Sequence, residues 1–122
     1  MTLIIFDLET TGLSPFTHEI IQIAATRVVV GDWETRESFA TFVRPSRRVP
    51  GFITGLTGIT QADVANAPAP AEALRAFSHF AGEGTTLVAH NGGRFDVPFI
   101  RESCLRHRLP VRETAFIDTC PL

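Results

Sequence analysis

Two acidic side chains stand two residues apart at the end of an apolar stretch near the N-terminus. Asp7 and Glu9 follow the run "TLIIF" of residues 2–6. Because successive side chains of a strand alternate between its faces, both carboxylates are expected on the same face. Acids buried without a partner cost free energy, and carboxylate oxygens are the ligands that Mg²⁺ and Mn²⁺ prefer. The spacing therefore indicates a cation site at the end of a strand.

A third acid, Asp96, stands in the stretch "VAHNGGRFDVPFI" of residues 88–100. It follows an apolar strand pattern and opens a helical one, so it is expected at the carboxyl end of the sheet, where open α/β folds build their sites. If the strand of residues 85–91 runs parallel beside the first strand, Asp96 converges with Asp7 and Glu9. Three carboxylates at one edge form a candidate divalent metal site.

Each of these residues also has a purely structural interpretation, which the sequence leaves open. An Asp-x-Glu pair at a strand end is common in solvated turns, and Asp96 has the side chain of a helix N-cap. The sequence equally allows a core histidine at His90, a turn residue at Asn91, a core filler at Phe95 and a solvated loop, rather than a phosphate clamp, at Arg47 and Arg48.

Apolar periodicity and turn residues predict the order β-β-β-α-β-α-β, and thus an α/β domain. Residues 2–7 are expected to form a central strand buried on both faces, because this short run is apolar and β-branched. Gly31 and Asp32 are expected to join the next two strands, over residues 19–30 and 33–43, in a tight antiparallel turn. The later strands, the last over residues 114–119, are expected to run parallel to the first through helical crossovers.

Helical patterns occupy three stretches of the sequence. Residues 58–68 predict one short helix, with Thr60 as its N-cap and Asp63 at the third helical position. Residues 70–84 and 95–108 predict longer helices from their apolar spacing. The apolar faces expected for the two longer helices are Leu74, Phe77 and Phe80, and Phe95, Phe99 and Leu105.

The composition is that of an ordinary globular domain of 122 residues, with 44% hydrophobic and 20% charged residues. A formal net charge of −2 gives no net field that attracts polyanions, so any nucleic-acid binding must be local. All 11 basic residues are arginines, which suit phosphate, although codon bias explains the same count equally well. Cys104 and Cys120 form no CxxC or zinc pattern and predict reduced thiols in a cytoplasmic protein. No signal peptide and no membrane span are predicted.

The stretches "FDLETTGL" (residues 6–13) and "VAHNGGRFDVPF" (residues 88–99) together resemble the first two motifs of the DnaQ-like, or DEDDh, family of 3′–5′ exonucleases. This family includes the proofreading epsilon subunit of bacterial DNA polymerase III and the TREX-type exonucleases. The shorter stretches "LTGIT", "NAP" and "IDT" also resemble family sequences, so the resemblance covers essentially the whole chain. The spacer of Gly92, Gly93 and Arg94 is more similar to the TREX-type form, and it leaves the choice between DNA and RNA open.

The resemblance implies an RNase H-like mixed sheet, with an antiparallel first hairpin and then parallel strands, flanked by helices. It implies two Mg²⁺ or Mn²⁺ ions, with Asp7 bridging both, Glu9 completing the site of one ion and Asp96 holding the other. The residues that it implies for binding the 3′-terminal nucleotides are Thr10, Thr11, Gly12, Leu13, Asn91, Arg94 and Phe95. The implied reaction is two-metal hydrolysis of phosphodiester bonds at single-stranded 3′ ends. The implied partners are a DNA polymerase or other replication and repair proteins.

The family's third motif, a histidine general base followed five residues later by a metal-binding aspartate, is missing from the 122 residues. We therefore expect residues 1–122 to be the front part of an exonuclease domain, with little or no activity by themselves and with an apolar sheet surface that favours a homodimer. The alternative is a non-catalytic nucleic-acid-binding or scaffold module derived from an exonuclease. Retention of all three acids favours the enzyme, because a pure binding module has no need for clustered like charges.

Overall fold

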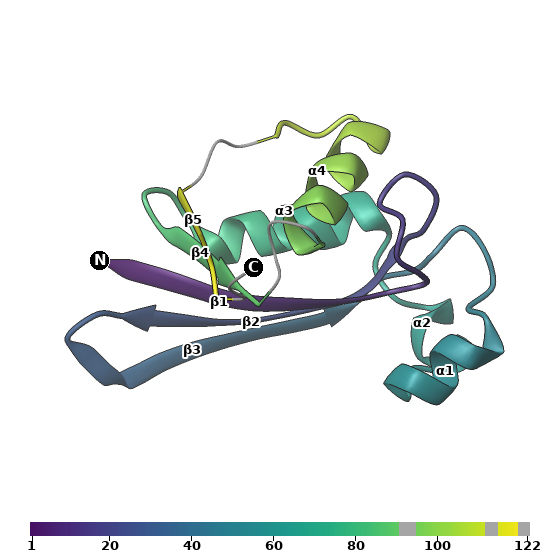
Figure 1. The fold of residues 1–122 in the computed structure, drawn as a ribbon, viewed down its shortest axis with the longest axis horizontal. Helices are drawn as coiled ribbons and strands as arrows, with labels where there is room; N and C mark the ends of the chain where they lie inside the picture. The colour runs from purple at the N-terminus through teal and green to yellow at the C-terminus, as the bar shows by residue number, and fades with distance from the viewer. Residues whose placement is uncertain (91–94, 112–114, 120–122) are drawn as a thin grey trace.

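The fold is built on a mixed five-stranded sheet in the order β3-β2-β1-β4-β5. A computed structural model describes residues 1–90, 95–111 and 115–119 (Figure 1). The strands are β1 (Thr2–Thr10), β2 (Ile20–Val29), β3 (Asp32–Phe42), β4 (Thr86–Ala89) and β5 (Ala115–Asp118). The N-terminal run that carries the two acids is therefore the central strand.

The pairing of the strands follows the predicted pattern. β1 pairs antiparallel with β2, and β2 pairs antiparallel with β3. On its other side β1 pairs parallel with β4, which pairs parallel with β5. The predicted mixed α/β sheet, with an antiparallel first hairpin and then parallel strands, is confirmed.

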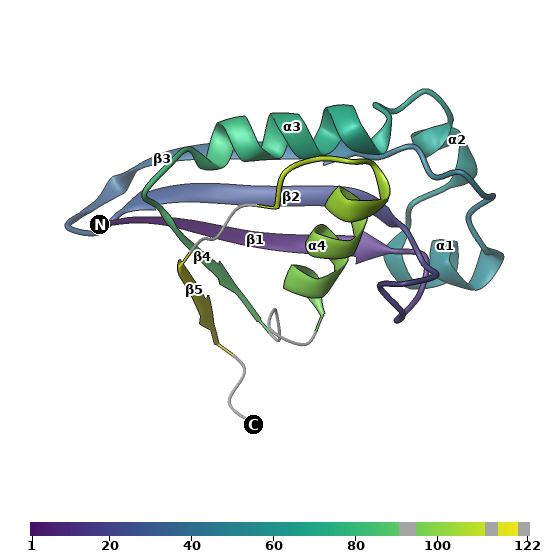
Figure 2. The same cartoon turned by 90° about the horizontal axis from the view of Figure 1, so that it is seen from above.

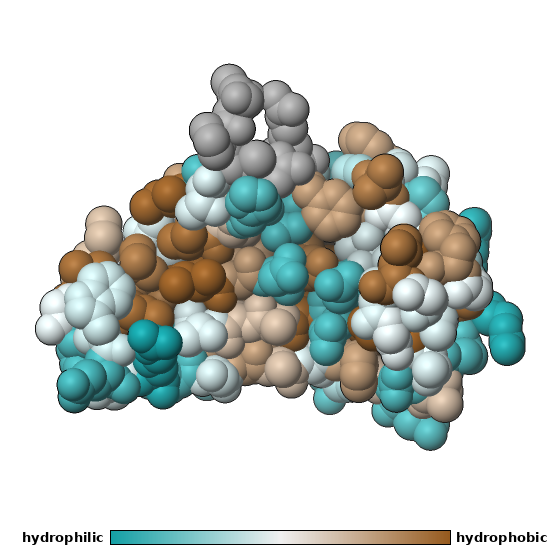
Figure 3. All heavy atoms as spheres, turned by 60° about the horizontal axis from the view of Figure 1, so that its bottom comes forward, coloured by the Kyte–Doolittle hydropathy of each residue, from teal (hydrophilic) through white to brown (hydrophobic). Residues whose placement is uncertain are grey.

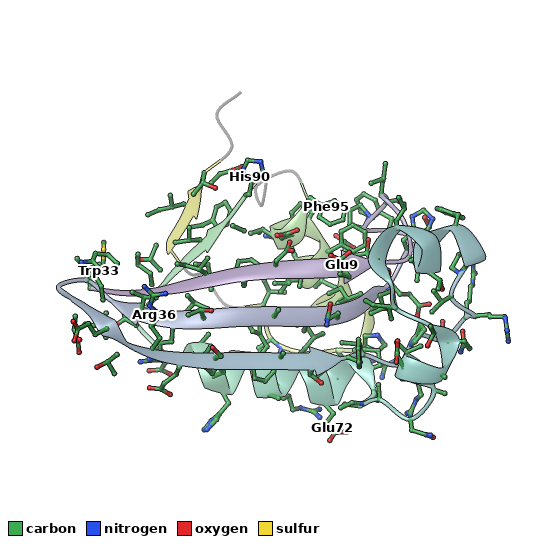
Figure 4. The ribbon with its side chains drawn as sticks, turned by 90° about the horizontal axis from the view of Figure 1, so that it is seen from below. Glu9, Trp33, Arg36, Glu72, His90 and Phe95 are labelled. Carbon is green, nitrogen blue, oxygen red and sulfur yellow. The ribbon has the colours of Figure 1, made fainter. Side chains whose placement is uncertain are left out.

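The turn between β2 and β3 lies one residue earlier than predicted. β2 ends at Val29 and β3 begins at Asp32, so Val30 and Gly31 form the connection. Gly31 has a φ of +95°, a conformation that glycine adopts without steric cost. Trp33 and Arg36, near this turn, lie at the end of the sheet far from Glu9 (Figure 4).

Four helices lie in the described part of the chain: α1 (Gly51–Thr57), α2 (Gln61–Ala65), α3 (Pro70–Ala81) and α4 (Asp96–Arg106). The predicted cap of α2 is confirmed. The Thr60 hydroxyl accepts the Asp63 N–H at 3.2 Å, and the Asp63 carboxylate accepts the Thr60 N–H at 2.8 Å. This reciprocal capping box satisfies two N–H groups at the start of the helix.

Helix α1 was not predicted from the sequence. It starts after Pro50 and ends at Gly58, which has a φ of +79°. At seven residues it is too short to display an apolar period, and Ile53 is its buried residue. Ile53 packs in a small second cluster with residues of β2, α2 and the adjoining loops: Ile21, Val49, Ile59 and Val64.

Helices α3 and α4 cover the same face of the sheet (Figures 1 and 2). On β1, Ile4, Phe6 and Leu8 point into this core and are at most 4% exposed. Ile5 and Asp7 alternate with them and are exposed on the opposite face. The expectation of a strand buried on both faces is therefore wrong, because the described helices of the main core pack on one face alone.

The apolar face predicted for α4 is also partly wrong. Phe99 is 1% exposed, but Leu105 is 54% exposed. Six residues advance an α-helix by 600°, which leaves Leu105 about 240° around the axis from Phe99. Cys104, next to it, takes the inward position.

Across the residues described, no helix combines the length and apolar character needed to cross a membrane.

Candidate active site

Asp7 and Glu9 lie on the open face of β1, opposite the core. Asp7 is exposed, and Glu9 is half-buried toward the carboxyl end of the strand. Burial and the nearby Asp7 carboxylate raise the pKa of Glu9 above its usual value. The two acids therefore repel each other on one face of the central strand.

Asp96 is the buried member of the acidic group. It is 2% exposed and is the first residue of α4. Its Oδ2 atom has no hydrogen-bond partner within the described chain. Burial, followed by the charges of Asp7, Glu9 and Asp118, raises its pKa to about 7. The N-cap interpretation is wrong, because the N-cap residue is Phe95 and no side chain caps this helix.

Asp118, at the end of β5, is a fourth acid that the sequence analysis did not single out. It faces Ala89 of β4 in the parallel pairing and contributes to the raised pKa of Asp96. Its position at the carboxyl end of a predicted parallel strand, within the stretch "IDT", is the signal that could have found it.

The four carboxylates form an electrostatically coupled group and not a finished coordination cage. Over residues 1–90, 95–111 and 115–119, no three His, Cys, Asp or Glu side chains are close enough together to hold a metal ion. The donor chemistry nevertheless fits a hard divalent cation, since all the donors are carboxylate oxygens and one buried oxygen lacks a partner. A cation there would reduce the repulsion among the acids.

The loop that follows β1 is held in shape by its threonines. Thr10 donates its hydroxyl to the Gly12 carbonyl at 2.6 Å. Thr11 accepts the Glu19 N–H on its hydroxyl at 3.0 Å and donates its own N–H to the Glu19 carbonyl at 2.9 Å. Both threonine side chains are buried, whereas Leu13 is 84% exposed. The loop thus presents Leu13 to solvent on a fixed base.

Gly12 is required at its position by a contact inside the loop. A Cβ atom added there would lie 2.5 Å from the ring of His18. That ring also accepts the Ser14 N–H on Nδ1 at 3.0 Å, which fixes its orientation. Any larger residue at this position therefore forces the His18 ring to move, a constraint that the motif alone did not indicate.

The residues around the second motif divide into three groups. Phe95 is partly buried and packs against Phe99, with ring centroids 4.8 Å apart, so the core-filler interpretation describes it. His90 is exposed, and its Nδ1 lies 3.4 Å from the Thr119 hydroxyl, so the core-histidine interpretation is wrong. Asn91 and Arg94 lie outside the described residues.

The arginine pair before α1 belongs to an exposed loop. Arg47 and Arg48 are both exposed. The backbone N–H groups of Ser46 and Arg47 donate to the Glu19 carboxylate at 2.8 and 3.3 Å. Glu19 thereby ties this loop to the base of the loop after β1.

Comparison with protein families matches residues 4–122 to the RNase_T exonuclease family. The chain belongs to this exonuclease family. The resemblance to the DnaQ-like exonucleases is confirmed. A DNA polymerase III subunit epsilon-like protein of Rhodobacter capsulatus is 51% identical over 102 residues, covering 83% of this chain and 14% of its own length.

A PolC-type DNA polymerase III of Lactococcus lactis subsp. lactis is 43% identical over 118 residues, covering 97% of this chain and 7% of its own length. The chain thus spans a small part of the relatives that it matches. Among solved structures, E. coli exonuclease I in complex with an oligonucleotide superimposes with a TM-score of 0.83 at 22% identity, covering 96% of this chain and 28% of the other. That likeness supports the RNase H-like exonuclease fold.

Proposed function

We propose that this domain belongs to a divalent-cation-dependent enzyme that hydrolyses phosphodiester bonds from the 3′ ends of single-stranded nucleic acid. The observation that carries the proposal is the buried, unpartnered Oδ2 of Asp96 beside Asp7 and Glu9. A carboxylate in that setting is stabilised by a positive charge. DNA is the preferred substrate in this proposal, since the relatives are named as DNA polymerase III proteins.

In this proposal Asp7, Glu9 and Asp96 hold two Mg²⁺ or Mn²⁺ ions. When bound, such ions lower the pKa of the attacking water and neutralise charge on the phosphodiester. Asp96 contributes a carboxylate whose place is fixed by the start of α4. Its raised pKa means that a cation competes with a proton for this side chain near neutral pH.

In this proposal the loop after β1 binds the 3′-terminal nucleotide of the substrate and sets its position. Thr10 and Thr11 are engaged in the loop's own hydrogen bonds, so they shape the backbone. Leu13 is exposed and offers an apolar surface to a terminal base, which suits binding without sequence readout. Asn91, Arg94 and Phe95 remain proposed contacts of the terminal nucleotides. The proposed partners are a DNA polymerase or other replication and repair proteins. The proposed location is the cytoplasm.

Calorimetric titration with Mn²⁺ tests the acid site. Glu9→Gln removes one ligand charge with little change of shape, and we expect Mn²⁺ affinity to fall at least ~10-fold, since even outer-shell changes reach that size. The matched control is Glu72→Gln, because Glu72 is exposed on α3 on the far side of the sheet from Glu9 (Figure 4). Equal Mn²⁺ binding by wild type and Glu9→Gln would refute the site.

A second candidate function is a nucleic-acid-binding or scaffold module without catalysis. The 122 residues contain no histidine followed five residues later by an aspartate, so they do not themselves supply a general base of that kind. Cation-dependent shortening of a 5′-labelled strand from its 3′ end, in steps of one nucleotide, supports the enzyme. Binding of the same strand without cation and without shortening supports the module.

A further inference from the structure

We propose that Arg106 is a positioning residue for the substrate, because it holds the tip of the loop after β1 against helix α4. We call residues 11–19 the β1–β2 loop. The inference rests on the proposed function, in which this loop receives the 3′-terminal nucleotide. It assigns a role to a residue that lies outside both sequence motifs.

The β1–β2 loop is closed at its base by its own hydrogen bonds. Thr11 and Glu19 pair across the base through their backbones. Higher up, the Ser14 carbonyl accepts the N–H groups of Thr17 and His18 at 3.3 and 2.8 Å. These bonds define the fold of the loop but leave the carbonyl groups of Pro15 and Phe16 to partners elsewhere.

Arg106 supplies that partner. Its Nη2 donates to the Pro15 carbonyl at 3.1 Å and to the Phe16 carbonyl at 3.3 Å. A guanidinium is planar and always charged, so it can serve two neighbouring carbonyl groups at once. The contact joins positions about ninety residues apart in the sequence and links the tip of the loop to a helix of the core.

Helix α4 thereby connects two parts of the proposed site. Asp96 is its first residue and Arg106 its last. An α-helix of eleven residues is about 15 Å long and stiff, so the place of the loop tip is fixed relative to the Asp96 carboxylate. A substrate held by the loop then meets the acids in a constant geometry, which is what positioning contributes to a reaction.

The side chains that this arrangement displays are apolar and exposed. Leu13 is 84% exposed and Phe16 is 72% exposed. The aromatic ring of Phe16 can stack on a nucleobase whatever the sequence, and Leu13 can pack against a base as an apolar surface. Holding the backbone of Phe16 in place lowers the ordering cost of such stacking, so loss of Arg106 should weaken end binding while the acids remain intact.

Fluorescence anisotropy with a 5′-labelled single-stranded oligothymidine tests the inference. Two versions of the strand are compared, one ending in a 3′ hydroxyl and one in a 3′ phosphate, with Ca²⁺ as the cation. The variants are Arg106→Ala, Arg106→Lys and the control Arg101→Ala, which removes an exposed arginine of the same helix. Calorimetry with Mn²⁺ and thermal unfolding are measured on each variant.

We expect wild type to prefer the 3′-hydroxyl strand, and Arg106→Ala to bind that strand ~5–10-fold more weakly while its affinity for the 3′-phosphate strand changes less than ~2-fold. Arg106→Lys should recover part of the preference, because an ammonium still donates to a carbonyl. Arg101→Ala should match wild type. Mn²⁺ affinity should be unchanged in all variants.

The outcomes separate the two proposals. If wild type binds both strands equally, end recognition is refuted and this inference falls with the proposed function. If wild type prefers the 3′ hydroxyl and Arg106→Ala keeps the same preference, only the role of Arg106 is overturned. An equal loss of affinity for both strands, accompanied by a lower unfolding temperature, overturns it as well, since it reflects a purely structural contact.

Discussion

At the scale of single residues, Asp96 makes stability depend on pH. The usual pKa of an Asp side chain is 3.8, and the pKa of Asp96 in the folded protein is about 7. Between about pH 4 and 7 the folded state therefore keeps a proton on Asp96 that the unfolded state releases. Stability therefore falls as pH rises from about 4 to 7 and stays reduced above, by no more than about 4 kcal/mol.

The pH dependence can be measured by urea unfolding with EDTA between pH 5 and 8. We expect wild type to lose stability over this range and Asp96→Asn to lose less, because its side chain carries no charge to bury. Asp32→Asn, an exposed acid, serves as the control and should follow wild type. Parallel curves for wild type and Asp96→Asn would contradict the burial of a charged Asp96 above pH 7.

Gly12 offers a second prediction at the same scale. In Gly12→Ala the new Cβ meets the His18 ring at 2.5 Å, so the ring must move and its bond with the Ser14 N–H is lost. We expect a loss of ~1–3 kcal/mol in unfolding free energy. The matched control is Gly55→Ala in α1. A Cβ added there meets nothing within 4 Å, so alanine should raise the unfolding free energy by ~0.5–1 kcal/mol. Denaturant unfolding of both variants decides, and equal effects would contradict the contact.

At the scale of elements, the capping box of α2 gives a simple test. Thr60→Ala removes the hydroxyl that accepts the Asp63 N–H and should cost ~1 kcal/mol of stability. Thr60→Ser keeps the hydroxyl and should stay within a few tenths of a kcal/mol of wild type. Urea unfolding measures both, and equal losses would show that the hydroxyl contributes nothing.

Much of the element order followed from local signals in the sequence. The strand patterns and the Thr60 cap were each predicted, because they depend on residues close together in the chain. Helix α1 was missed, since its cues are Pro50 at the N-cap and Gly58 at the C-cap, with one buried residue between them. The exposure of Ile5 depends on which face of the sheet the helices cover, and no local pattern gives that. Leu105 differs, because helix geometry alone places it away from Phe99.

The candidate site divides in the same way. Asp7, Glu9 and Asp96 were predicted as site residues from their types and from the ends of the elements that carry them. The contacts that His18 and Arg106 make in the β1–β2 loop were not predicted. His18 packs against a glycine, and Arg106 donates to a backbone carbonyl about ninety residues away in the sequence. Backbone acceptors carry no residue identity, so the sequence gives no signal for them.

At the scale of the whole molecule, the open face of the sheet favours association. Apolar side chains gather on it (Figure 3), with Ile5 and Ile117 each 45% exposed. We expect the average mass of the 122-residue chain to rise with concentration, toward a homodimer, because apolar surface of this kind is buried by self-contact. Sedimentation of wild type, Ile5→Thr and the control Leu105→Gln tests this. Only Ile5→Thr should shift the chain toward monomer, and a monomeric wild type at every concentration would refute the prediction.

Catalysis by the 122-residue chain should be weak. A positioned general base typically contributes ~10²–10⁴ to the rate, and the family's His-to-Asp pair is absent from these residues. We expect little shortening of a 5′-labelled oligonucleotide with Mg²⁺ or Mn²⁺ on a gel. Rapid shortening that stops with EDTA and is lost in Asp7→Asn would show that the chain activates water by other means.

The central place of β1 also constrains the order in which the molecule can assemble. β1 can pair with β2, and β2 with β3, as soon as these strands have been synthesised, but the other edge of β1 waits for β4, which begins at Thr86. During synthesis a sheet of three strands therefore carries both N-terminal acids, and the edge of β1 that later pairs with β4 keeps its backbone hydrogen-bonding groups free for tens of residues. The charge of Asp7 and Glu9 on that strand disfavours wrong pairing with a second such sheet. The same two carboxylates therefore oppose aggregation of the nascent chain before Asp96 has been synthesised.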